Sequence, residues 1–154
     1  MNLVKDVSQY LANAALRAPF NRTGFTRREL KGMGLVGQNI FFSRFPEADD
    51  TPDSLIVLFE YAGQPVNALD GAYRCLSLQV QVRDTAYESG LQRAQTIDSL
   101  LTVVGNTDWG VPPLSINGTR YDRFVALQSP YKLKEDSQRR LYFAQNYRVW
   151  ARKL

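Results

Sequence analysis

Histidine is absent from this chain, and cysteine occurs once, at Cys75. Without imidazole the sequence lacks the commonest general base and metal ligand near neutral pH, which excludes serine–histidine triads and histidine-ligated zinc. A single thiol cannot close an intramolecular disulfide or build a thiolate metal site, and it is typical of a reducing compartment. We therefore expect a protein of the cytoplasm with no catalytic residue, no cofactor and no metal.

Long hydrophobic runs are also missing. No segment approaches the about 20 apolar residues of a membrane span. Residues 1–16 lack the apolar centre of a signal peptide, because Lys5, Asp6, Gln9 and Asn13 interrupt them. Of the 154 residues, 44% are hydrophobic and 22% are charged, which is typical of one globular domain. We expect residues 1–154 to form a single domain that does not bind a membrane.

Hydrophobic periodicity predicts an α+β fold. Leu76, Leu78, Val80 and Val82 alternate with polar residues, as in a strand with one buried face, and this suits an antiparallel sheet. Asn117-Gly118 supplies the positive φ angles of a tight hairpin turn. We predict a mostly antiparallel sheet of about five to six strands with two main helices packed on it. The helices are expected from Asn2 to no later than Pro19 and over 85–104, and the strands over 39–45, 54–61, 73–83, 114–116, 121–127 and 140–152.

The segments between these elements carry charge. Residues 20–38 lack a sustained period and are interpreted as a mobile basic loop, and 130–139 as a charged connection. The basic residues Arg22, Arg27, Arg28 and Lys31 accompany Phe20 and Phe25. This mixture is that of a subunit interface, a solvent-exposed loop or a nucleic-acid contact. The letters of Gly32-Met-Gly34-Leu-Val-Gly37 fit a dinucleotide fingerprint, but a strand-like segment follows and no βαβ unit surrounds them, so no cofactor is predicted.

Two further groups are candidates for contacts between proteins. Glu47, Asp49, Asp50 and Asp53 lack the spacing of a complete calcium loop, so we interpret them as a solvated loop that marks a subunit edge. The last strand carries large amphipathic side chains on one face. Such a face is either a protein interface or is covered by a helix of the same chain. These side chains are Tyr142, Asn146, Arg148, Trp150 and Arg152.

The order of several phrases in the chain resembles the tail terminator family of long-tailed bacteriophages, also labelled minor capsid or tail completion proteins. The resemblance spans most of the chain, although the basic segment 21–31 is longer than expected for the family. It is carried by Pro52-Asp53, the run Ile56–Tyr61 with Gly63, Leu78-Gln79-Val80-Gln81-Val82-Arg83 leading to Tyr87, Ile116-Asn117-Gly118, Ser129-Pro130, and Glu135-Asp136 through Arg140 to Asn146-Tyr147-Arg148-Val149.

The resemblance implies a small α/β subunit that forms a hexameric ring at the head-proximal end of the tail. Such a ring stops growth of the tail tube and docks to the head connector, with DNA only passing through its lumen. The partners expected are the tail tube protein and the connector protein, and the location is the virion tail after assembly in the host cytoplasm. The alternatives are a head-side connector or stopper protein, and a nucleic-acid-binding module that uses the basic loop.

A ring contact joins two different patches of one subunit, so opposite charges on separate loops suit it. We expect Asp49 and Asp50 of one copy to meet Arg27 and Arg28 of the next. The residues that we expect at subunit or partner interfaces, from their charge, size and loop position, are Arg22, Arg27, Arg28, Lys31, Asp49, Asp50, Lys132, Lys134, Arg148 and Trp150.

Overall fold

A computed structural model describes residues 2–14, 39–46, 51–61 and 73–154. Two α-helices and seven strands form in these ranges, which confirms the α+β prediction. In chain order they are α1 (Leu3–Ala14), β1 (Ile40–Phe42), β2 (Leu55–Tyr61), β3 (Tyr73–Asp84), α3 (Tyr87–Thr102), the short 3-10 helix η2 (Thr107–Trp109), β4 (Leu114–Ile116), β5 (Thr119–Ala126), β6 (Tyr131–Glu135) and β7 (Leu141–Lys153).

The strands form one sheet in the order β1-β2-β3-β7-β5-β4. The long strands β3 and β7 pair antiparallel along their length, from Tyr73 opposite Arg152 to Asp84 opposite Leu141. On the other edge of β7, β5 pairs with its second half and β6 with its first residues. Among the strands of the described ranges, only β1 and β2 run parallel. The sheet is therefore mostly antiparallel, as predicted.

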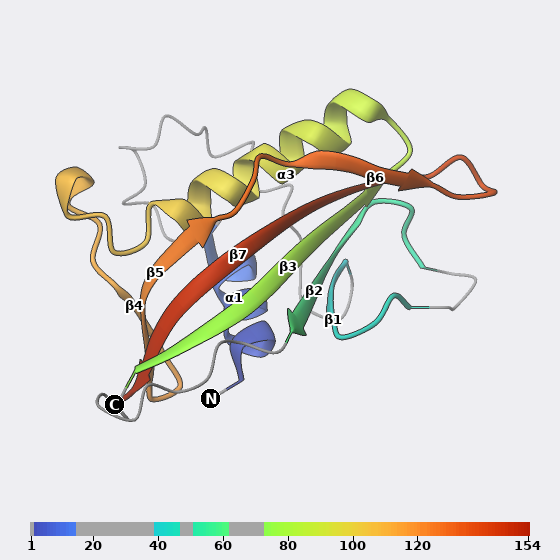
Figure 1. The fold of residues 1–154 in the computed structure, drawn as a ribbon. Coiled ribbons are helices and arrows are strands. Elements are labelled where there is room, and N and C mark those ends of the chain that lie inside the picture. Colours follow the sequence, from blue (N-terminus) through green and yellow to red (C-terminus); the bar gives the residue numbers. More distant parts are fainter. Residues whose placement is uncertain (1, 15–38, 47–50, 62–72) are drawn as a thin grey trace.

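Both described helices pack on one face of this sheet (Figure 1). The side chains of Leu78, Val80 and Val82 on β3 are buried against them, and those of Phe143, Tyr147 and Val149 on β7 join the same core. Helix α1 begins where predicted, because the Asn2 side-chain oxygen accepts a hydrogen bond from the Lys5 amide. Successive side chains of a strand point to opposite faces of the sheet, so the hydrophobic residues at every second position determine which face is buried.

Helix α3 ends at a close contact with β5. After Thr102 the chain turns at Gly105, which has a φ of +70°. A Cβ atom at Gly105 would lie 1.7 Å from the carbonyl oxygen of Asp122 on β5. Only glycine fits both the left-handed backbone and this approach, so the end of the helix is fixed against the sheet.

The structure corrects one detail of the sequence interpretation and adds a polar contact between α3 and β7. Residues 130–139 are not simply a charged connection, because they contain β6. All five side chains of β6 are exposed, so its apolar residues Tyr131 and Leu133 mark no buried face, and its backbone pairing with β7 defines the strand. On α3, the Asp98 side chain points towards the sheet. Its Oδ1 accepts hydrogen bonds from Gln145 Nε2 at 2.6 Å and Tyr147 Oη at 3.2 Å on β7.

Candidate interaction surface

The face of the sheet opposite the two helices carries the predicted residues Arg148 and Trp150. Both lie at even-numbered positions of β7, whereas the core residues Phe143, Tyr147 and Val149 lie at odd positions. Arg148 is exposed, and 39% of Trp150 is exposed. The alternative that a helix covers this face is wrong for the described part of the chain, since α1 and α3 pack on the other side.

The centre of this face is a row of polar side chains from three strands. Tyr61 Oη on β2 donates to Gln79 Oε1 on β3 at 2.7 Å, and Gln79 Nε2 donates to Asn146 Oδ1 on β7 at 2.9 Å. Gln81 Nε2 also donates to Gln79 Oε1. These bonds run across the strands and hold the amide groups in fixed positions, which makes this face a rigid surface.

Arginines from two neighbouring strands surround Trp150. Arg123 on β5 is its cross-strand neighbour, and Arg120 is opposite Arg152. A bulge between Tyr121 and Arg123 brings Asp122 to the same side, where its Oδ1 lies 2.6 Å from Arg120 Nε. Its Oδ2 lies 3.8 Å from Arg152 Nε, too far for a hydrogen bond. One carboxylate therefore faces two guanidinium groups here.

The sole thiol lies beside this arginine group. Cys75 on β3 is opposite Trp150 and is buried. Burial raises the pKa of the Cys75 thiol, and the positive charge of Arg148 partly opposes that rise. The thiol is therefore protonated at neutral pH and is no candidate nucleophile.

The two predicted lysines of β6 lie on opposite sides of the sheet. Lys134 is opposite Tyr142, and its ammonium group is 4.6 Å from the centre of the Tyr142 ring. Lys132 is opposite the core residue Phe143 and is 3.1 Å from Glu135. The structure thus places Lys134 with Arg148 and Trp150 on the helix-free face, and Lys132 on the other.

The turn between β6 and β7 is built around Asp136. Its carboxylate accepts hydrogen bonds from Arg140 Nε at 2.8 Å, Tyr142 Oη at 3.1 Å and the Gln138 amide at 2.9 Å. Desolvation acts to raise the pKa of Asp136, but the bonds from Arg140, Tyr142 and Gln138 prevail and lower it to about 2. The hairpin is held by an ionised carboxylate throughout the neutral range.

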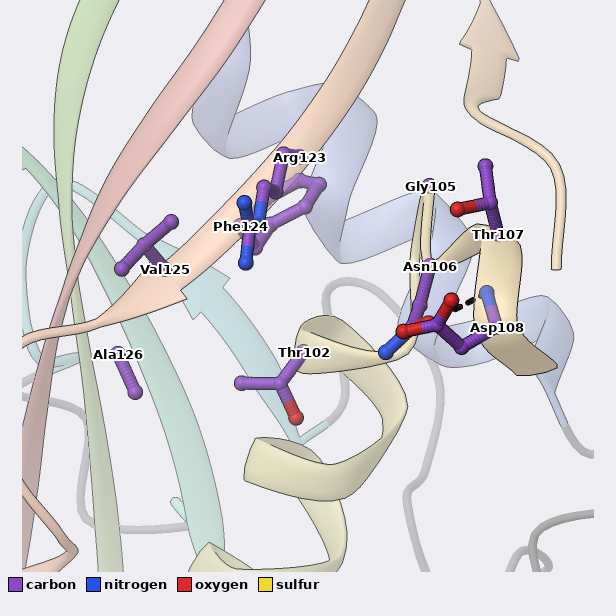
Figure 2. A pocket seen from close by; sticks show the side chains of 9 residues that line it. All are labelled: Thr102, Gly105, Asn106, Thr107, Asp108, Arg123, Phe124, Val125 and Ala126. Atoms are coloured by element: carbon purple, nitrogen blue, oxygen red, sulfur yellow. Dashed lines mark hydrogen bonds between the residues drawn. The ribbon is translucent and has the colours of Figure 1, made fainter.

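A pocket of about 330 Å³ lies between the end of α3, η2 and β5 (Figure 2). Figure 2 shows Asn106 and Asp108 on one side and the β5 residues on the other, and the Asp108 amide donates to Asn106 Oδ1 at 3.0 Å. The sequence interpretation did not find this pocket, although Gly105 marks the chain reversal that forms it. None of the four predicted interface residues that the structure describes lines it: Lys132, Lys134, Arg148 and Trp150.

The other six predicted interface residues lie outside the described ranges. They are Arg22, Arg27, Arg28, Lys31, Asp49 and Asp50, and the proposed mobile loop 20–38 lies there too. In the part of the chain that is described, no group of three or more Cys, Asp or Glu side chains is arranged to hold a metal ion. No helix in the same ranges is long and apolar enough to cross a membrane.

Together these features define an α+β protein with a helix-covered core and an exposed arginine–aromatic surface. A family model described as bacteriophage tail terminator protein matches residues 29–148. The chain therefore belongs to the bacteriophage tail terminator family, and it is a structural protein of the phage tail. A search of curated proteins found no match.

Proposed function

We propose that six copies of this protein form a ring at the head-proximal end of the tail. The ring caps the tail tube, stops its growth and presents the surface to which the head connector docks. The observation that carries this proposal is the match of residues 29–148 to tail terminator proteins. The exposed Arg148 and Trp150 support it, because arginine and tryptophan are enriched where proteins bind one another.

This function requires protein partners and no reaction. The tail tube protein binds one side of the ring and the connector binds the other, while DNA only passes through the lumen. The protein would be assembled in the host cytoplasm and remain in the virion as a minor capsid component. We retain all ten predicted interface residues as proposed contacts.

The experiment is to polymerise the tail tube protein of the same phage with and without this protein, and to examine the tubes by negative-stain electron microscopy. We expect shorter tubes with a ring at one end. Tubes of unchanged length with bare ends would overturn the terminator function. In that case, incubation with DNA-filled heads tests the head-side connector alternative, because a stopper protein binds the head without any tube.

A further inference from the structure

Positive charge is concentrated at one end of the helix-free sheet face. We name the group around Trp150 the arginine patch. It consists of the exposed residues Arg123, Arg148 and Trp150 and of the partly buried Arg120 and Arg152. The strand register places these side chains in adjacent positions of β5 and β7. Asp122 is the one carboxylate within hydrogen-bond or ion-pair distance of them in the described ranges, and it is already bonded to Arg120. The patch therefore retains a net positive charge.

Negative charge is concentrated in a separate stretch of sequence. Residues 45–73 contain six carboxylates and no lysine or arginine. Four of the six fall between Pro46 and Ser54, and they are Glu47, Asp49, Asp50 and Asp53. We name residues 47–53 the acidic segment. Of its four carboxylates the structure describes Asp53, whose side chain is 63% exposed.

The described flanks of the acidic segment lie at the opposite end of the sheet from the arginine patch. The Phe45 ring packs against Tyr142 with the ring centres 5.2 Å apart, and Asp53 lies 3.8 Å from Arg140. Tyr142 is the second residue of β7 and Arg140 immediately precedes the strand, whereas Trp150 is eight positions beyond Tyr142. At about 3.3 Å per residue, the two ends are ~26 Å apart.

We infer that the arginine patch of one copy binds the acidic segment of a neighbouring copy in the ring. A heterologous, head-to-tail contact joins two unlike patches of the same subunit, as the arginine patch and the acidic segment are, and such a contact generates a ring when its rotation closes. Opposite charges set the register of the contact and accelerate association. This inference rests on the proposed ring, and it assigns to Asp49 and Asp50 a different partner from Arg27 and Arg28.

The rigidity of the patch favours it as the receiving surface. Its arginines project from paired strands, and Asp122 restrains Arg120, so less side-chain freedom is lost on binding. Trp150 supplies apolar area between guanidinium groups that bind carboxylates through paired hydrogen bonds. Because the attraction is between charges near the surface, the ring should dissociate more readily as salt concentration rises.

The test reverses charge at the two exposed arginines of the patch, in the double variant Arg123→Glu/Arg148→Glu. We measure oligomeric mass by native mass spectrometry and sedimentation, both for the free protein and for caps released from tube ends. We expect at least a tenfold weakening of subunit association. Adding Asp49→Arg/Asp50→Arg to that variant should restore the ring, because the charges again oppose one another.

A matched control is Arg74→Glu/Lys153→Glu, which makes the same charge change at exposed positions outside the patch. A direct test is disulfide cross-linking in a protein whose native thiol is removed by Cys75→Ser. In this background, Asp50→Cys together with Arg148→Cys should form disulfides between neighbouring copies and give cross-linked oligomers up to the full ring. Circular dichroism verifies that each variant is folded.

Two outcomes overturn the inference. The first is that the folded Arg123→Glu/Arg148→Glu variant still forms intact rings, which does not contradict the terminator function. If Arg27→Glu/Arg28→Glu alone then abolishes the ring, the contact lies in the basic segment 21–31. The second is that the same variant keeps its rings and loses only its binding to duplex DNA. That result would show that the patch contacts nucleic acid and not a neighbouring copy. Failure of the wild-type protein to cap tubes instead contradicts the proposed function.

Discussion

Asn117 Nδ2 donates a 2.7 Å hydrogen bond to Asp6 Oδ1, and so joins the turn between β4 and β5 to helix α1. Tyr121 Oη on β5 donates to the other oxygen of the same carboxylate. Asp6 is only 2% exposed. Burial raises the pKa of Tyr121 well above its ordinary value, and the bond to Asp6 raises it further, so the phenol remains the donor. The buried Asp6 carboxyl group is thus held by two donors from a distant part of the chain.

Replacing Asp6 with alanine removes the acceptor for both donors. Leaving buried polar groups unpaired costs about 1–3 kcal/mol each, so we expect Asp6→Ala to lower the free energy of unfolding by about 3 kcal/mol. Urea denaturation followed by circular dichroism measures this. The control is Lys5→Ala on the exposed side of α1, which should change stability by less than about 0.5 kcal/mol. Equal effects of the two substitutions would show that the carboxylate is unimportant.

Gly105 and Gly118 test backbone strain separately from steric clash. Both have positive φ, of +70° and +73°. A Cβ at Gly105 would overlap the Asp122 carbonyl, whereas nothing lies within 4 Å of a Cβ at Gly118. We expect Gly118→Ala to cost about 1 kcal/mol from the left-handed conformation alone. Gly105→Ala should cost at least about 3 kcal/mol more, or prevent folding, because backbone atoms must move. Thermal or urea unfolding of both variants compares them, and similar losses contradict the predicted clash.

Asp136 should make stability depend on pH in the acidic range. Its pKa is about 2 in the folded protein and about 3.9 in an unfolded chain. Because the folded-state pKa is the lower one, the stabilisation is fully present above about pH 4 and is lost as pH falls towards 2. Subtracting the stability of Asp136→Asn from that of the wild type isolates this contribution from other carboxylates. The difference should be constant from pH 5 to 7 and shrink below pH 4, and a difference that stays constant down to pH 2 contradicts the assignment.

Local sequence patterns predicted most of this fold because the spacing of hydrophobic residues reflects which side chains are buried. The alternation from Leu76 to Val82 predicted β3 and its buried face, and Asn117-Gly118 predicted the hairpin turn that the structure has. Residues 131–135 bury no side chain, so no buried face could identify them as a strand. Their strand exists because the first residues of β7 offer unpaired backbone groups.

The surface was predictable only in part. The parity of β7 placed Arg148 and Trp150 together on one face, and that face does lie opposite the helices. The contribution of β5 was missed, because a bulge at Tyr121–Arg123 shifts which residues face outward. Pairing between distant strands, as of Arg123 with Trp150, depends on tertiary register, which no local pattern specifies.

The Cys75 thiol offers a probe of the charge on Arg148. Burial raises the thiol pKa and Arg148 lowers it, so removal of that charge should raise the pKa further. We expect the midpoint of the pH dependence of reaction with a disulfide reagent to move upward in Arg148→Ala, since the thiolate is the reacting form. Arg148→Lys keeps the charge and is the control, and its midpoint should stay near that of the wild type. The midpoint, unlike the rate, is insensitive to a simple change in access to the thiol. An upward shift in both variants, or in neither, would mean that the Arg148 charge does not act on Cys75.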